Sequence, residues 1–147
     1  MHRLLHTLRL LLTEHGSLGQ FVRANATDGY GAVNAICAYF AAHEASTVIP
    51  RDTKSACKRV CMRWMVRDGS PVDLGLWTRF IDKRTLIMPL DTHVVQQSQR
   101  LGLFRSRTAS MSAARRLTQA MLEVFPDDPL KGDFALFGYG VNTAGQT

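Results

Sequence analysis

Apolar residues recur along the chain at the spacing of an α-helix rather than that of a β-strand. Between residues 28 and 43, Val33, Ile36, Cys37 and Phe40 fall at positions i, i+3, i+4 and i+7, which aligns them on one helix face. The sequence shows no sustained alternation of apolar and polar residues, the pattern that predicts strands. Helices are predicted over residues 4–14, 18–22, 28–43, 54–66, 91–102, 110–124 and 130–141.

Glycine, proline and short polar residues separate these helices. Breaks are predicted near Gly16, over 44–53, at 67–71 and at 126–129. Residues 72–81 are predicted to form a short apolar helix or an irregular packed segment. Residues 84–90 are apolar and predicted to be extended, so that they deliver the chain to Asp91.

The length of the chain, 147 residues, suits one domain with its own core. The sequence therefore predicts an all-α fold, an irregular helical bundle over residues 1–142, with a small polar tail at 143–147. In such a short chain some apolar helix faces are expected to stay exposed. We expect those faces to favour self-association.

Hydrophobic runs and cysteines indicate the cellular compartment in which the protein is expected to function. No apolar run approaches the ~20 residues that span a bilayer, and the leucine-rich start, interrupted by Arg9, predicts an amphipathic helix rather than a signal peptide. The three cysteines, Cys37, Cys57 and Cys61, lack the spacing of a metal site. Cys57 and Cys61 are predicted to pack with Trp64 in one buried helical stripe. We expect a reducing, cytoplasmic setting and no metal or cofactor.

Positive charge dominates the sequence. Eighteen Lys and Arg residues against twelve Asp and Glu residues give a formal charge of +6, which suits a polyanionic partner. The basic residues gather in two groups: Arg51, Lys54, Lys58, Arg59, Arg63 and Arg67, and then Arg100, Arg105, Arg107, Arg115 and Arg116. Two interpretations remain open, a solvated helix face or a surface that contacts phosphates.

Asp91 lies between the extended apolar segment and the helix that follows it. This position predicts a helix N-cap, where backbone N–H groups and the positive end of the helix dipole favour a charged carboxylate. One interpretation is a capping role and nothing more. The other is that the fixed carboxylate serves a reaction in which positive charge develops.

Three stretches carry a resemblance to a known family: 58–67 (KRVCMRWMVR), 89–94 (PLDTHV) and 133–142 (DFALFGYGVN). Together they resemble a conserved bacterial protein family of unknown function that is related to the helix-hairpin-helix DNA glycosylase superfamily. In that superfamily a short apolar lead-in, Asp, Thr or Val, and His open a helix. The resemblance covers most of residues 1–142 and is most specific from Ser55 onward.

The resemblance implies part of the helix-hairpin-helix glycosylase fold and the removal of damaged bases from double-stranded DNA. It implies that Asp91 stabilises the sugar cation that forms when the N-glycosidic bond breaks, and that a lysine amine attacks where strand cleavage follows. Positive neighbours and an apolar flank favour the neutral form of Lys58. Lys58 is ranked ahead of Lys54, because the string around it is the one that most resembles the bacterial family. Lys54 lies in Lys-Ser-Ala, which resembles the Lys-Thr-Ala of bifunctional glycosylases.

The DNA-contacting residues expected on this basis are Arg51, Arg59, Arg63, Arg67, His93 and Lys131. Trp64 and Trp77 are expected in the core, with base stacking as the alternative. The chain departs from the superfamily pattern because it lacks a Gly-rich hairpin, begins part-way along the family fold, and has no cysteine after Cys61 for an iron–sulfur cluster. These departures favour the alternative function, a non-catalytic nucleic-acid-binding helical protein.

Overall fold

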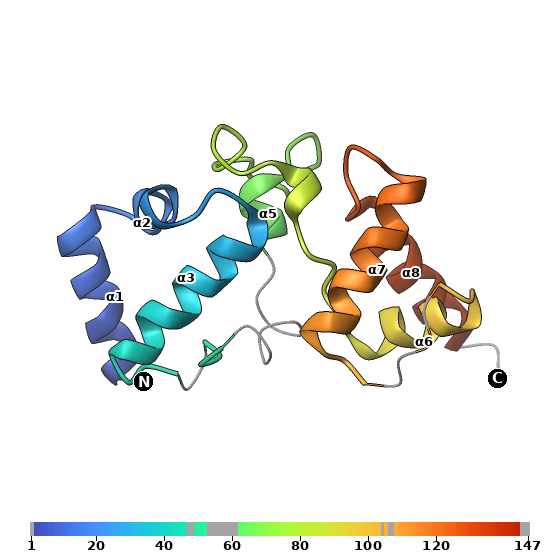
Figure 1. Ribbon diagram of the computed structural model, residues 1–147, viewed down its shortest axis with the longest axis horizontal. Helices are drawn as coiled ribbons and strands as arrows, with labels where there is room; N and C mark the ends of the chain where they lie inside the picture. Colours follow the sequence, from blue (N-terminus) through green and yellow to red (C-terminus); the bar gives the residue numbers. More distant parts are fainter. Residues whose placement is uncertain (1, 47–48, 53–61, 104, 106–107, 145–147) are drawn as a thin grey trace.

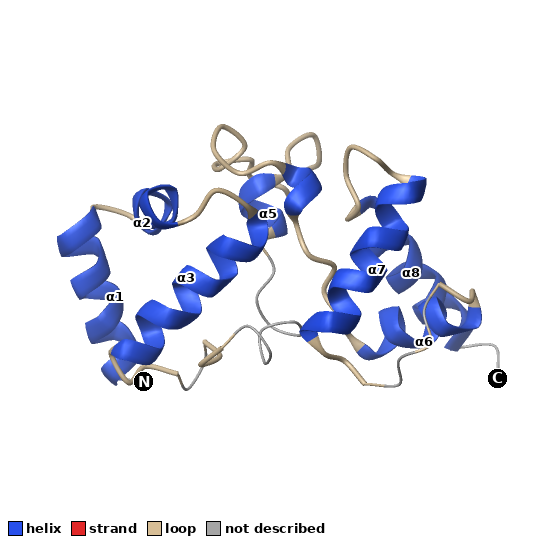
Figure 2. Ribbon diagram, in the orientation of Figure 1, coloured by secondary structure: helices blue, strands red, loops and turns tan. Residues whose placement is uncertain are grey.

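The computed structural model describes residues 2–46, 49–52, 62–103, 105 and 108–144. Within these residues every regular element is a helix, so the predicted all-α fold class is confirmed (Figure 2). The elements are α1 (His2–His15), α2 (Leu18–Asn25), α3 (Gly29–Ala42), α5 (Arg63–Val66), the 3-10 helix η1 (Lys83–Thr85), α6 (Thr92–Arg100), α7 (Met111–Val124) and α8 (Lys131–Ala144).

The helices form two groups at the two ends of the molecule (Figure 1). Helices α1, α2 and α3 make the first group, and α6, α7 and α8 make the second, with α5 and the loops around it between them (Figure 1). In the described part of the chain, no helix combines the length and the apolar character needed to cross a bilayer.

The first group is built from helices whose starts and ends are set by local chemistry. Gly16, with φ +75°, follows the end of α1, and the Ser17 hydroxyl accepts the Gln20 amide proton at 3.1 Å to cap α2. Asp28 caps α3 in the same way, since its carboxylate accepts the Gly31 amide proton at 2.6 Å. The predicted face of α3 is buried, since Val33, Ile36, Cys37 and Phe40 are all part of the core.

The second group follows the same rules. Ser110 caps α7, because its hydroxyl accepts the Ala113 amide proton at 3.2 Å. Gly102, with φ +70°, follows the C-terminus of α6 where the predicted helix was expected to end. Helices α6 and α8 pack closely, because Gly140 brings the α8 backbone near the side chains of His93 and Gln97.

An irregular segment links the two groups. Residues 72–81 contain turns and no helix, which confirms the irregular alternative, and residues 86–90 are extended after η1. Leu86, Met88 and Leu90 alternate inward along this stretch and are buried. The extended segment thereby carries the chain from the first group to Asp91 at the start of α6.

The helix predicted over residues 54–66 is described only at its end, where α5 covers Arg63–Val66; Cys57 and Cys61 lie outside the described residues. The prediction that Trp64 is buried is wrong, since its side chain is 62% exposed. The physical reason is that Arg63, on the neighbouring face of α5, turns inward to two aspartates, Asp73 and Asp133. Trp77, at 3% exposed, lies in the core as predicted.

Candidate functional site

Asp91 caps α6 and keeps its carboxylate accessible. Its Oδ1 accepts the Val94 amide proton at 2.7 Å, which fixes the side chain at the positive end of the helix dipole. The residue is nevertheless exposed to solvent. The N-cap role predicted for Asp91 is therefore confirmed, and its exposed side chain leaves the carboxylate accessible to a ligand.

A hollow of about 490 Å³ opens beside Asp91. Its walls come from the first turns of α6 and from the residue before α7: Leu90, Asp91, Thr92, Val95, Gln96, Gln99 and Ala109. Hollows of about 300–1,000 Å³ are the size that binds small organic groups in proteins. The lining combines an apolar floor with hydroxyl, amide and carboxylate groups, which suits a ligand with both a flat apolar body and polar edges.

A buried cluster of charged side chains lies behind α5. Arg63 contacts Asp73 through Nε at 3.3 Å and Asp133 through Nη1 at 3.2 Å. Arg67 contacts Asp73 at 2.9 Å and Asp128 at 2.8 Å. These pairs join α5 to the loop after it and to the start of α8, and the two arginines face three aspartates, so the cluster carries a net negative charge.

Asp133 connects this cluster to Asp91. Burial raises the pKa of the Asp133 carboxyl above its usual value; the nearby Arg63 lowers it in part, and the negative charge of Asp91 raises it further. The packing of α6 on α8 agrees with this proximity, since the rings of His93 and Phe137 meet edge to face with centroids 5.7 Å apart. The charge of Asp91 therefore acts on Asp133, and the two residues lie at the N-termini of two helices that pack on each other.

The prediction that Arg63 and Arg67 contact DNA requires correction. Both are buried, with Arg63 only 5% exposed, and their guanidinium groups bind aspartates rather than facing solvent. A charged group in the interior needs opposite charges around it, and the cluster supplies them. As the structure stands, neither side chain is available to a DNA phosphate.

The other predicted site residues fall into two sets. Lys54, Lys58 and Arg59 lie outside the described residues. Arg51 and Lys131 are exposed, and His93 is half-buried against α8. Their roles in DNA binding stay predictions.

Sequence reasoning missed the buried aspartates. Asp133 lies in the first turn of the last helix, and its contact with Arg63 was not foreseen. The one weak signal was Asp73, an acidic residue between Val72 and Leu74. Its partners lie on α5 and could not be read from its neighbours in the sequence.

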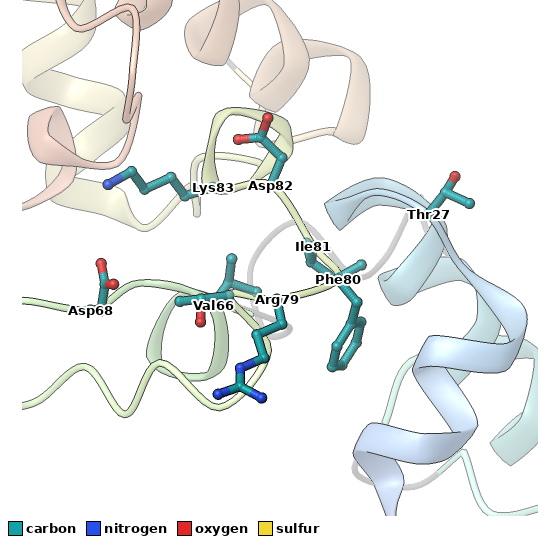
Figure 3. Close-up of a pocket in the computed structure, with 9 residues that line it drawn as sticks. Thr27, Val66, Asp68, Arg79, Phe80, Ile81, Asp82 and Lys83 are labelled. Carbon is teal, nitrogen blue, oxygen red and sulfur yellow. The ribbon is translucent and has the colours of Figure 1, made fainter.

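A second hollow, of about 530 Å³, lies where the first helical group meets the central loops. Figure 3 shows Thr27 on one side, Val66 and Asp68 on another, and residues 79–83 between them, with Arg79 and Lys83 extending in different directions. Its carboxylate Asp82 is already engaged, because Arg84 donates to it at 2.8 Å and holds the pKa of that carboxyl below its usual range. The mixed charges of this hollow give no single reactive group a fixed position.

Among the described residues, no group of three His, Cys, Asp or Glu side chains comes together to hold a metal ion. A family model described as a protein of unknown function (DUF2400) matches residues 1–142. No curated protein and no solved structure matches the chain.

Proposed function

The chain belongs to the DUF2400 family of proteins of unknown function, and from that premise we propose that it acts on double-stranded DNA as a glycosylase-like enzyme that removes damaged bases. The proposal is supported by the resemblance of residues 58–67, 89–94 and 133–142 to a family related to helix-hairpin-helix glycosylases. The reaction class is cleavage of the N-glycosidic bond between a base and its sugar.

The observation that carries the proposal is the position of Asp91 beside the hollow of about 490 Å³. When an N-glycosidic bond breaks, the sugar gains positive charge, and a fixed carboxylate next to it lowers the energy of the transition state. The same carboxylate can accept a proton from the attacking water. The base must first leave the DNA stack, which costs a few kcal/mol, and enter a pocket such as the one that Asp91 lines.

Base release is the direct test. Purified protein is incubated with duplex oligonucleotides that each carry one deaminated, oxidised or alkylated base, and free base is measured for wild type and for Asp91→Asn. We expect the variant to lose at least about 100-fold in rate, because the negative charge at the sugar is removed. Asparagine is an N-cap residue of similar strength, so the fold is preserved.

Asp68→Asn is the matched control, since it removes an exposed carboxylate that lines the other hollow. It should leave base release unchanged. The proposal is refuted if folded wild-type protein binds these duplexes and releases no base from any of them, or if Asp91→Asn is as active as wild type.

A lysine nucleophile would add strand cleavage to base removal. The amine attacks the sugar carbon and forms a Schiff base, which borohydride reduces to a stable covalent complex. Trapping with an oligonucleotide that carries an abasic site therefore names the nucleophile when it is compared among wild type, Lys58→Ala and Lys54→Ala. Failure to trap any complex would leave water as the nucleophile, with Asp91 as its general base.

Exposed cations favour a second candidate function, binding to nucleic acid without catalysis. The exposed side chains of this kind in the described part of the chain include Arg51, Arg100, Arg105, Arg115, Arg116 and Lys131. If they contact phosphates, the logarithm of the binding constant falls with the logarithm of salt concentration by roughly 0.9 for each phosphate contacted. Steep salt dependence without base release would assign this second function.

A further inference from the structure

We propose that Asp133 is a positioning residue for the reaction at Asp91, its charge strengthening the field that Asp91 applies to the substrate, and that Arg63 holds it in place. The inference rests on the proposed function, because it concerns the same site. Asp133 lies in the first turn of α8, and Asp91 caps the α6 helix that packs on α8.

Asp133 is the least compensated of the three aspartates in the buried cluster. Asp73 receives both arginines, at 3.3 Å from Arg63 and 2.9 Å from Arg67. Asp128 receives Arg67 at 2.8 Å and also the Leu130 amide at 3.2 Å. Among the residues that the structure describes, the ion pair of Asp133 is with Arg63 alone, from Nη1 at 3.2 Å.

The guanidinium of Arg63 is shared among several partners, so only part of its positive charge compensates Asp133. Its guanidinium lies 3.6 Å from the centroid of the Phe134 ring, and its Nε is committed to Asp73. Its Nη2 is buried and has no hydrogen-bond partner. Because Arg63 is fixed on both sides, it fixes the orientation of the Asp133 carboxyl while leaving part of its negative charge uncompensated.

The charged and titratable groups that face Asp133 come from every element around it. Arg63 and Arg67 face it from α5, and Asp91 faces it from the start of α6. Asp73 and Asp128 share its arginines, His93 lies against Phe137 on the same helix pair, and Lys131 is two residues away on α8. Of these, Asp91 is the acidic group whose charge acts on Asp133.

The protonation of Asp133 is coupled to the charge of Asp91. Burial and the charge of Asp91 raise the pKa of Asp133, so the Asp133 side chain, 14% exposed, stays neutral after pH has risen through its usual range. Once it ionises, a second negative charge stands behind Asp91 and adds to the stabilisation of the sugar cation. The rate of base release should therefore rise with pH through a step that belongs to Asp133.

The test is the pH profile of base release between pH 4 and 8 for wild type, Asp133→Asn and Asp128→Asn. Asp133→Asn should lose the Asp133 step and reach a plateau about tenfold lower. Asp128→Asn disturbs the same cluster without touching the group that faces Asp91, so it should keep this step. If Asp133→Asn keeps the step, or if Asp128→Asn loses it equally, Asp133 has only a structural role and the proposal is overturned.

A second measurement does not depend on activity. The side-chain carboxyl of Asp133 is titrated by carbon-13 NMR in wild type, Asp91→Asn and Asp68→Asn. The midpoint should fall in Asp91→Asn, because a neighbouring negative charge is removed, and stay unchanged in Asp68→Asn. If the midpoint of Asp133 is unchanged in Asp91→Asn, the inference is overturned, and the proposed function still depends on the base-release assay. If the midpoint shifts but the wild-type protein releases no base, the proposed function is overturned and the coupling of the two carboxyl groups stands.

Discussion

At the scale of single residues, Asp91 has a structural and a chemical role that substitutions can separate. Its carboxylate accepts the Val94 amide proton at 2.7 Å, and the residue remains exposed at the edge of a hollow. Asparagine retains the acceptor and removes the charge, whereas alanine removes both. Comparing the two substitutions tells how much of any loss of activity comes from the helix and how much from the charge.

The first prediction concerns the stability of the Asp91 variants. Asp91→Ala should lower the free energy of unfolding by about 1 kcal/mol, since the Val94 amide loses its acceptor at the start of α6. Asp91→Asn should stay within about 0.5 kcal/mol of wild type. Urea unfolding followed by circular dichroism measures both, and equal losses in the two variants would show that the cap contributes nothing.

At the scale of the helices, the site depends on how closely α6 and α8 approach. A Cβ atom added at Gly140 would lie 3.1 Å from the His93 Cβ and 3.2 Å from the Gln97 Cγ. Gly138, two residues earlier on α8, has no atom within 4 Å of such a position. Of these two glycines of α8, Gly140 therefore serves packing and Gly138 does not.

The second prediction follows from this difference. Gly140→Ala should push α8 away from α6 and lower the free energy of unfolding by about 1–3 kcal/mol, as overpacking does. Gly138→Ala should raise stability by about 0.5–1 kcal/mol, because alanine favours the helix and meets no neighbour. Thermal unfolding of the two variants gives the answer, and the same sign of change in both would show that the close approach of α6 and α8 carries no energetic weight.

At the scale of the whole molecule, the segment before Asp91 ties the two helical groups together. The Thr85 hydroxyl accepts the Gly29 amide proton at 2.8 Å and donates to the Asp82 carbonyl at 2.7 Å. On the other side, the Met88 amide donates to the Thr118 hydroxyl on α7 at 2.9 Å. The segment that leads to Asp91 is therefore hydrogen-bonded to both helical groups.

The third prediction tests this tie. Thr85→Val keeps the shape of the side chain and leaves the buried Gly29 amide without an acceptor, which should lower the free energy of unfolding by about 1–3 kcal/mol. Thr85→Ser keeps the hydroxyl and should stay closer to wild type. Chemical unfolding distinguishes the two, and equal stability of the valine and serine variants would contradict the role assigned to the hydroxyl.

The sequence by itself determined the helices and their ends. Helical spacing and the capping residues Asp28, Asp91 and Ser110 act within three or four positions along the chain, so each could be read from its own neighbourhood. The same local chemistry placed Asp91 at the start of a helix. The extended approach to Asp91 could be read in the same way, because it is a short apolar run that follows a break.

Tertiary structure alone decided which side chains of α5 face inward and which group stands behind Asp91. Helical spacing assigned Trp64 to the core. Arg63 took the inward position instead, because it pairs there with two aspartates, which lie 10 and 70 residues away in the sequence. The partner of Arg67 on the far side of the cluster is 61 residues away. An ion pair over such separations exists only once the helices have packed, so no local pattern could announce it. For the same reason it was the fold that set the helix carrying Asp133 against the helix that Asp91 caps.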